Sequence, residues 1–435
     1  MRRYESYKYS GVEWLGEIPS HWECLPIRSI FKFRNEKNDP IKTDNILSLS
    51  IANGVTEYSD ENRGGNKRKD DLSSYKLAYP NDIVLNSMNV IVGAVGVSKY
   101  FGAISPVYYA LSLYNQRANL SYYENIFKNE NFQRGLLRFG KGILIKFGEN
   151  GKMNTIRMKI SQDDLKKLYF PIPPLDEQQK IAQFLDEKTA KINQAVDLAE
   201  KQIALLKEHK QILIQNAVTR GLNPDVPLKD SGVEWIGQVP EHWELTIGMN
   251  VFRENKRDNK GMKENTVLSL SYGKIIIKPE EKLFGLVPES FETYQIVEPN
   301  DIIIRCTDLQ NDQTSLRTGL AQDKGIITSA YLNLKVINNY SAKFLHYYLH
   351  VLDITKVLYK FGSGLRQNLS FLDFKRLPII DVPLAEQQQI ADYLDAQIAK
   401  IDQAIALKTA HIEKLKEYKS VLINDVVTSK VRVSV

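Results

Sequence analysis

The chain has 435 residues, more than one hydrophobic core normally supports, so two or more domains are expected. Its 43% hydrophobic and 25% charged residues are typical of folded proteins and exclude a disordered chain. The 58 Lys and Arg against 52 Asp and Glu give a net charge of +6, which permits a polyanionic partner and argues against an acidic mimic of DNA.

Cysteine usage and hydropathy indicate the cellular compartment. Two cysteines, Cys24 and Cys306, cannot build a disulfide framework and lack the spacing of a zinc site. The most apolar short run, residues 90–97, is far too short to span a membrane, and no signal segment follows Met1. We therefore expect a cytoplasmic protein with no membrane partner.

The chain repeats itself from its N-terminal motif onward. SGVEWLGEIPSHWE at residues 10–23 returns as SGVEWIGQVPEHWE at residues 231–244, with ten of fourteen positions identical. Three further pairs follow in the same order: ILSLS at 46 with VLSLS at 267, PNDIVL at 80 with PNDIII at 299, and PPLDEQQKIAQFLD at 173 with VPLAEQQQIADYLD at 382. A unit of roughly 220 residues used twice is a duplicated domain and not a solenoid repeat.

Each repeat begins with a globular part, over residues 1–160 and 231–375. Short β-branched runs such as NDIVLNS and DIIIRCT are punctuated by Gly, Asn and Asp, which predicts strands with turns. Helical segments are expected near residues 119–140 and 341–361. The fold class is therefore α/β, with two globular domains of mixed α/β type.

Each repeat ends in a long helix, predicted over residues 177–219 and 386–430. Apolar side chains recur at alternating steps of three and four residues, which is the heptad seam of a coiled coil. The seam residues are Leu185, Ile192, Val196, Ile203, Leu206 and Leu213 in the first helix, and Leu394, Ile401, Ile405, Ile412, Leu415 and Leu422 in the second. The simplest partner for each seam is the other one, in an antiparallel coiled coil with a pseudo-twofold repeat.

Two lysines, Lys210 and Lys419, occupy equivalent seam positions. A polar seam residue can fix the register of the two helices, or its amino group can extend to solvent, and the sequence leaves both alternatives open.

The tryptophans of the repeated motif, among them Trp22 and Trp243, could stack on bases. If the two repeats bind different nucleic-acid sequences, they should not share the residues that read them, so we predict that these rings pack against the helices instead. The stretches that differ between the repeats are the better candidates for DNA contact, because Lys and Arg bind phosphates while Asn, Gln, Arg and Asp can bind base edges. The candidates are Lys67, Arg68, Lys69, Asn86, Asn89, Lys256, Arg257, Arg305, Asp308, Gln310, Arg317, Arg366 and Gln367.

Catalytic chemistry is not indicated. His346 and His350 have the spacing of two metal ligands on a helix, but the HExxH pattern is missing and packing is the better interpretation, so no metal is predicted. The sequence has no GxxxxGK[ST] loop, no GxGxxG motif, no GxSxG elbow and no Asn/Asp-Pro-Pro-Tyr stretch. No catalytic residue and no cofactor are therefore predicted.

The twin tryptophan motifs, the paired DEQQ/AEQQ helix starts and the order domain, helix, domain, helix resemble the specificity subunit of type I restriction-modification systems over essentially the full chain. GSGLRQNLSFLDFKRLPI from residue 362 is also typical of that family, whereas its counterpart before the first helix carries an insertion.

The resemblance implies a non-catalytic subunit in which each target recognition domain reads one half of a bipartite, asymmetric site in double-stranded DNA. It further implies that the helices set the spacing and dock two methyltransferase subunits, which would bind S-adenosylmethionine, and that motor-nuclease subunits complete the complex. A coiled-coil protein whose domains bind protein, and a system that methylates without cutting, remain alternatives.

Overall fold

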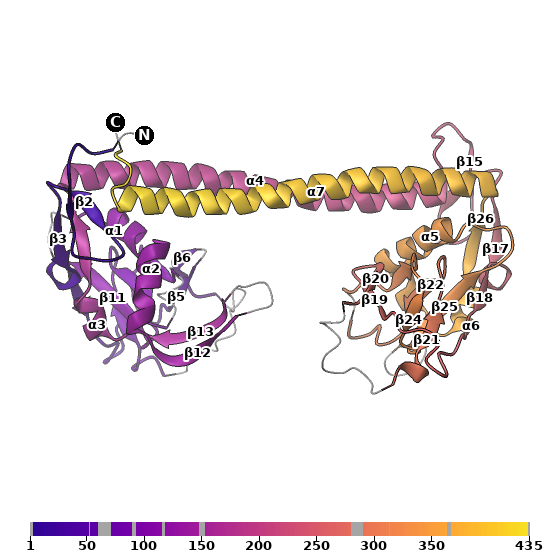
Figure 1. Ribbon diagram of the computed structural model, residues 1–435, viewed down its shortest axis with the longest axis horizontal. Helices are drawn as coiled ribbons and strands as arrows, with labels where there is room; N and C mark the ends of the chain where they lie inside the picture. Colours follow the sequence, from indigo (N-terminus) through magenta and orange to yellow (C-terminus); the bar gives the residue numbers. More distant parts are fainter. Residues whose placement is uncertain are drawn as a thin grey trace. The chain divides into compact units, whose positions relative to one another are not determined.

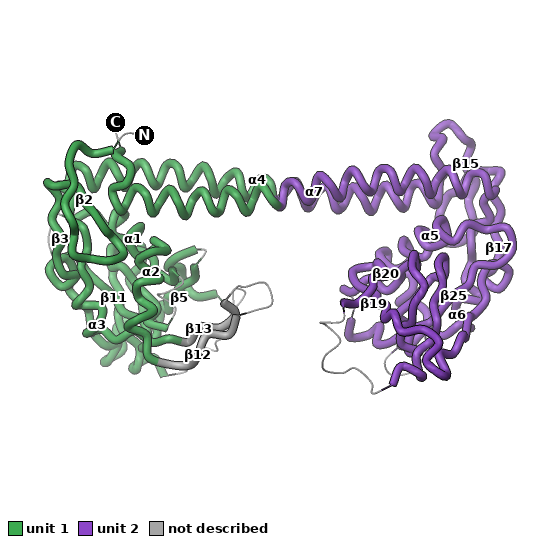
Figure 2. Tube along the Cα trace, in the orientation of Figure 1, with its two compact units in different colours: residues 1–199, 410–435 green, residues 200–409 purple. Residues whose placement is uncertain are grey.

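The computed structural model describes residues 3–51, 53–59, 71–88, 93–114, 118–147, 153–279, 290–312, 314–362 and 367–433. The chain divides into two compact units (Figure 2). Unit 1 consists of Met1–Ala199 with Ala410–Val435, and unit 2 of Glu200–Thr409. Each unit therefore contains one globular part and a stretch of both long helices, whereas the sequence assigned the helices to segments of their own.

Unit 1 is built around a four-stranded antiparallel sheet in the order β4–β11–β8–β9, of which Figure 1 labels β11. These strands are β4 (Phe31–Arg34), β11 (Tyr108–Leu113), β8 (Ile83–Asn86) and β9 (Val95–Val97). Five antiparallel pairs surround it: β1 (Tyr7–Tyr9) with β2 (Glu17–Pro19), β3 (Glu23–Pro26) with β14 (Tyr169–Ile172), β5 (Leu47–Ser50) with β6 (Gly54–Glu57), β7 (Lys76–Ala78) with β10 (Gly102–Ile104), and β12 (Lys141–Phe147) with β13 (Met153–Lys159). The short helices are α1 (Leu120–Phe127), α2 (Glu130–Leu136) and α3 (Gln162–Lys166).

Unit 2 repeats the central sheet and four of the five surrounding pairs. Its central sheet has the order β18–β25–β22–β23, from strands β18 (Phe252–Glu254), β25 (Tyr331–Val336), β22 (Ile302–Arg305) and β23 (Thr318–Leu320). The surrounding pairs are β15 (Leu228–Asp230) with β16 (Gln238–Pro240), β17 (Glu244–Ile247) with β26 (Pro378–Asp381), β19 (Leu268–Ser271) with β20 (Lys274–Ile277), and β21 (Gln295–Val297) with β24 (Gly325–Ile327). Its short helices are α5 (Ala342–Ile354) and α6 (Phe371–Arg376).

One sheet of unit 1 has no counterpart among the described strands of unit 2. It is the hairpin β12–β13, which coincides with the insertion seen in the sequence of the first repeat. The α/β class and the duplicated architecture are confirmed.

The central strands are buried on both faces, which explains why their sequences read as continuous apolar runs. Ile83, Val84 and Leu85 of β8 have no exposed surface, and neither do Ile302, Ile303 and Ile304 of β22. The helices beside these sheets begin at good caps. The Asn119 side chain accepts from the Tyr122 N–H at the start of α1, and Ser341 does the same for Phe344 at the start of α5.

The long helices are α4 (Leu175–Arg220) and α7 (Leu384–Val427), against predicted bounds of 177–219 and 386–430. In unit 1 the early turns of α4, with Leu185 and Ile192, share a core with the last turns of α7, with Leu422 and Val426. In unit 2 the late turns of α4 share a core with Leu394 in the early turns of α7. The helices therefore pair antiparallel within each unit, and the predicted coiled coil is confirmed.

Every predicted seam side chain is buried or half-buried. Two leucines outside the seam are mostly exposed, Leu198 at 56% and Leu205 at 63%.

Polar contacts across the seam decide between the two alternatives for the seam lysines. Lys210 Nζ donates to Asp402 Oδ1 at 2.7 Å, and Lys419 Nζ donates to Asn193 Oδ1 at 2.8 Å. A third seam lysine, Lys408, donates to Gln202 Oε1 at 2.7 Å. Each amino group reaches the facing helix, so these lysines specify the antiparallel register instead of extending to solvent.

Within the described part of the chain, no helix combines the length and the apolar character that a membrane crossing requires.

Candidate nucleic-acid interface

A histidine and a tryptophan from each repeated motif bind one glutamate at the start of a long helix. In unit 1, Trp22 Nε1 donates to Glu177 Oε2 at 2.9 Å, and His21 Nε2 lies 2.6 Å from Glu177 Oε1. Unit 2 repeats the arrangement with Trp243 at 3.0 Å and His242 at 2.8 Å from the two oxygens of Glu386. Both indole rings are fully buried, so the prediction that they pack against the helices is confirmed.

The residue after each glutamate, Gln178 or Gln387, connects the long helix to the globular part through hydrogen bonds. Gln178 Nε2 donates to the Pro173 carbonyl at 2.8 Å, while its Oε1 accepts from the Asn119 N–H at 2.9 Å. Gln387 makes the same two bonds, to the Val382 carbonyl and from the Ser341 N–H. Both glutamines are buried, and their bonds satisfy backbone groups that would otherwise lack partners. The sequence signal for these contacts was the repeated EQQ triplet. It carried the family resemblance, but no role was predicted for its glutamate or its glutamine.

The aspartate of each PND motif is a buried carboxylate that also belongs to the scaffold. Asp82 accepts from Arg34 Nε at 2.8 Å and from the Tyr79 N–H at 2.9 Å. Asp301 accepts from Arg257 Nη2 at 3.0 and 3.1 Å.

Arg257, a predicted DNA contact, also has a structural role, and its side chain remains 26% exposed, so its contact with DNA stays a prediction. Its guanidinium is held by the buried Asp301 and also pairs with Glu298 at 2.9 Å. A carboxylate that is almost wholly buried requires a charged partner, and Arg257 is that partner.

A loop over residues 306–317 connects β22 to β23 and is closed by Arg317. The Arg317 side chain has no exposed surface. Its guanidinium donates to the carbonyls of Arg305, Thr307, Asp308 and Asp312, and to the Tyr359 hydroxyl. The prediction that Arg317 reads a base needs correction, because all its donor groups are directed inward and fix the shape of the loop.

Arg305 stands at the end of β22, where the loop begins. It is half-buried, and its Nη1 lies 2.9 Å from Asp312 Oδ2. Hydrogen bonds from Ser315 and Thr314, together with the positive charge of Arg305, hold the pKa of Asp312 well below its usual range. A charged pair therefore sits at the base of the loop, with the guanidinium of Arg305 partly accessible.

The other described candidates are accessible to different degrees. Asn86, at the end of β8, is half-buried, and its Oδ1 accepts from the Met88 N–H at 3.0 Å. Asp308 binds the Asn311 amide at 2.7 Å. Lys256, Gln310 and Gln367 are exposed, with Lys256 paired to Glu254 at 3.2 Å. Their contact with DNA stays a prediction.

Five candidates lie outside the described residues, namely Lys67, Arg68, Lys69, Asn89 and Arg366.

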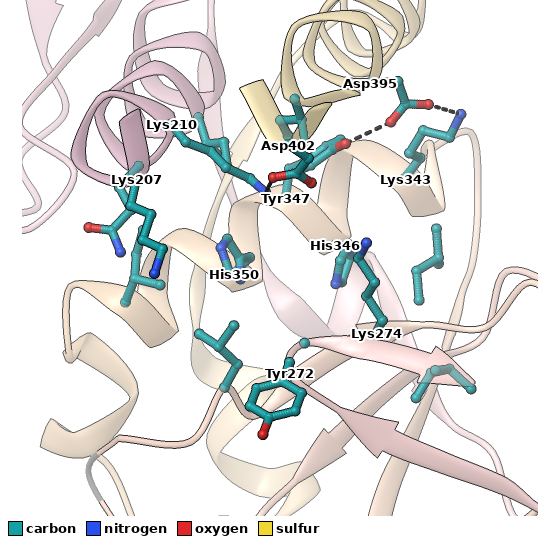
Figure 3. Close-up of a pocket in the computed structure, with 18 of the residues that line it drawn as sticks. Lys207, Lys210, Tyr272, Lys274, Lys343, His346, Tyr347, His350, Asp395 and Asp402 are labelled. Atoms are coloured by element: carbon teal, nitrogen blue, oxygen red, sulfur yellow. Dashed lines mark hydrogen bonds and ion pairs between the residues drawn. The ribbon is translucent and has the colours of Figure 1, made fainter. Parts of the chain in front are cut away.

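A cavity of about 790 Å³ lies in unit 2 between the long helices, α5 and the hairpin β19–β20 (Figure 3). His346 and His350 of α5 line it, and burial lowers the pKa of each to about 4, so both rings are neutral at pH 7. Four lysines and two aspartates also line it: Lys207, Lys210, Lys274, Lys343, Asp395 and Asp402. Among the residues that the structure describes, no cluster of three or more metal-ligating side chains occurs.

One framework is built twice in this chain, and the polar loops that it carries differ between the two copies. This arrangement is typical of a recognition protein. The chain belongs to the family of type I restriction modification DNA specificity domains, whose model matches residues 19–203 and 254–417. It is thus a DNA-recognition subunit of a restriction-modification complex and not a catalytic enzyme.

Two curated relatives from Methanocaldococcus jannaschii are similar over nearly the whole chain. The putative type I restriction enzyme MjaX specificity subunit is 24% identical, with 96% of each chain covered. The type I restriction enzyme MjaVIII specificity subunit is 22% identical, over 96% of this chain and 94% of the relative.

Two solved structures share the fold at 12% identity. One comes from work on complex assembly and conformational transition of the type I R-M system, with a TM-score of 0.67 over 94% of this chain and 98% of that chain. The other is the HsdS subunit from Thermoanaerobacter tengcongensis, with a TM-score of 0.51 over 95% and 98%.

Proposed function

We propose that each unit reads one half of a bipartite, asymmetric DNA site, and that the two long helices, which run through both units, set the separation of the halves. The observation that carries this proposal is the division between shared and divergent residues. The shared residues are structural: the His–Trp pairs that bind Glu177 and Glu386, and the buried aspartates Asp82 and Asp301. The loops on the same framework differ. Two unlike readers on one framework require an asymmetric site.

One scaffold position illustrates the divergence. The last residue of β8 is Asn86, and the last residue of the equivalent strand β22 is Arg305. Asparagine is suited to adenine and arginine to guanine in the major groove. The loop that follows is also longer in unit 2, with residues 306–317 against residues 87–94. Both differences support separate half-site sequences.

We further propose that two methyltransferase subunits dock on equivalent apolar stripes of the long helices. On α4, Leu198, Leu205 and Ile212 recur every seven residues and are 56%, 63% and 49% exposed. On α7, Leu407 and Val421 are 66% and 48% exposed. Seven-residue spacing places such residues on one face of a helix, and solvent-facing leucines in a row are unfavourable unless a partner covers them.

The repeat relates the stripes to each other. Adding the offset of 209 residues carries Leu198 onto Leu407 and Ile212 onto Val421, whereas Leu205 falls on Lys414, so the stripes match at their two ends. Two equivalent surfaces support two copies of one partner. Under this proposal the partners bind S-adenosylmethionine and the complex acts in the cytoplasm. Motor-nuclease subunits join it where the system also cuts.

We expect Leu407→Glu to reduce the number of bound methyltransferase subunits from two to one, and Leu198→Glu with Leu407→Glu to abolish docking. A carboxylate in an apolar interface costs about 2–4 kcal/mol, a loss of roughly 30-fold or more in affinity. Native mass spectrometry of the complex would count the subunits. Gln194→Glu, an exposed change on α4 outside the stripe, is the control. Two bound subunits in the double variant would exclude this surface.

Transfer of a labelled methyl group to DNA tests the proposed function as a whole. The chain with its cognate methyltransferase subunits should label duplexes that contain a split site, and the chain alone should label none. If the purified chain shows no preference for any DNA with or without those subunits, its domains bind protein instead and the proposal fails.

A further inference from the structure

A tyrosine stands almost fully in solvent at the tip of hairpin β19–β20. Ser271 pairs with Lys274, so the connection consists of Tyr272 and Gly273 alone. Both have positive φ, at 48° and 76°, which is the type I′ turn that twists with the strands. The first position of this turn normally holds Asn, Asp or Gly, because other side chains are strained at positive φ. Tyr272 accepts that strain with 92% of its surface exposed.

The hairpin that carries Tyr272 packs against the core of unit 2. Leu268 and Ile275 of its two strands belong to a small buried core with Ile303. The hairpin also lies directly on β23, since a Cβ added at Gly319 would come within 2.7 Å of Leu270 and 3.0 Å of Ile275. The hairpin therefore packs closely against the central sheet of unit 2.

The tip lies beside the loop that carries the base-reading candidates. A Cβ added at Gly273 would come within 3.0 Å of Leu316 Cδ1 and 3.7 Å of the Thr318 carbonyl. Leu316 directly precedes Arg317, whose bonds fix residues 305–312. The Tyr272–Gly273 turn therefore lies against the C-terminal end of the loop that follows Arg305 and contains Gln310.

Unit 1 has a related hairpin, in which Ser50 pairs with Gly54 and the connection is one residue longer than in unit 2. Its hairpin β5–β6 packs on β9, where a Cβ at Gly96 would come within 2.9 Å of Gly54 and Val55. Both hairpins begin with the shared LSLS strand, but the residue that follows it is Ile51 in unit 1, which is 61% exposed. The two units thus place different residues at the same point of a shared framework, as they also do in the loops after β8 and β22.

The charge near the tip favours a polyanion. The cavity beside the hairpin is lined by four lysines and two aspartates, and its two histidines are neutral at pH 7. Lys210 and Lys343 pair with the two aspartates, whereas Lys207 and Lys274 have no ion-pair partner among the described residues. Figure 3 shows Lys274 following Tyr272 on the hairpin, and Lys207 across the cavity on α4.

We propose that Tyr272 is a specificity-determining contact to the DNA half-site of unit 2, with its ring stacked on a base or inserted between two base pairs. Ile51 holds the corresponding place in unit 1. Aromatic rings stack on bases and wedge into flexible steps, and they favour sequences in which a step opens easily. This inference rests on the proposed half-site reading and adds a named residue to it.

The test uses the complete methyltransferase complex with Tyr272→Ala, Tyr272→Phe and, as a control, Tyr9→Ala, which removes a tyrosine that is 73% exposed on β1 of unit 1. Because the Tyr272 side chain contributes little to the core, the variants should fold. We expect Tyr272→Ala to weaken DNA binding by about 10- to 100-fold. It should also relax one or two base positions in one half-site, whereas Tyr272→Phe and Tyr9→Ala keep the original sequence.

Three results would overturn the inference or its basis, and they are distinguishable. If Tyr272→Ala leaves affinity and methylated sequence unchanged in an active complex, the ring does not contact DNA. If it weakens assembly with the methyltransferase subunits while the assembled complex binds DNA as before, the tip is a protein contact. If the unaltered complex methylates no split site, the proposed half-site reading itself fails.

Discussion

Replacing Arg317 by methionine is expected to destabilise unit 2 by about 3–5 kcal/mol, because the change leaves a cluster of buried acceptors without donors. Four carbonyls and the Tyr359 hydroxyl now bind this one guanidinium. Methionine fills a similar volume but donates nothing. Urea unfolding should show the loss, and hydrogen exchange should show it concentrated in residues 306–317.

The matched control, Arg305, is the last residue of β22, directly before the same loop. Arg305→Met removes a half-buried guanidinium that pairs with Asp312 at 2.9 Å, and partly exposed pairs contribute about 1 kcal/mol or less. If Arg305 contacts a base, this variant should alter the methylated sequence with little change in stability. Equal destabilisation by the two substitutions would contradict the structural role assigned to Arg317.

The second large effect concerns half-site spacing. Inserting one heptad into both long helices, at the level where Gln202 faces Lys408, lengthens each by about 10 Å. At 3.4 Å per base-pair step, the half-sites should separate by about three base pairs. Mapping methylated sites in a host that carries the variant would measure this change.

An insertion in α4 alone is the control. The register bonds Lys210–Asp402 and Lys419–Asn193 cannot then both form, so the coiled coil should lose stability without defining a new spacing. Original spacing in the doubly extended chain would show that the helices do not set the separation.

Local patterns in the sequence predicted the framework. The heptad seam needed only apolar side chains at regular steps, and Leu185, Ile192 and Leu422 are buried as expected. The tryptophans could be assigned to packing because the repeat presents them twice. These features depend on periodicity and duplication, which a single sequence displays directly.

The predictions for the interface were less successful because they depended on tertiary contacts. Arg317 and Arg257 stand in polar stretches typical of exposed loops, but they are held by groups that are distant in sequence, such as Tyr359 and Asp301. Nothing in a sequence distinguishes an arginine that binds a buried carboxylate from one that binds DNA. Tyr272 was missed although a two-residue turn after LSLS indicates a hairpin, because exposure is decided by what packs on the tip.

The central claim is that the two units read DNA independently, and a chimera tests it most directly. Residues 25–155 would be replaced by those of another family member. His21, Trp22 and Glu177, which bind one another, and both long helices are then unchanged. Methylation sites would then be mapped across the genome of a host with the original or the chimeric chain. We predict that one half-site changes, while the other half and the spacing are retained. A change in both halves would contradict independent reading.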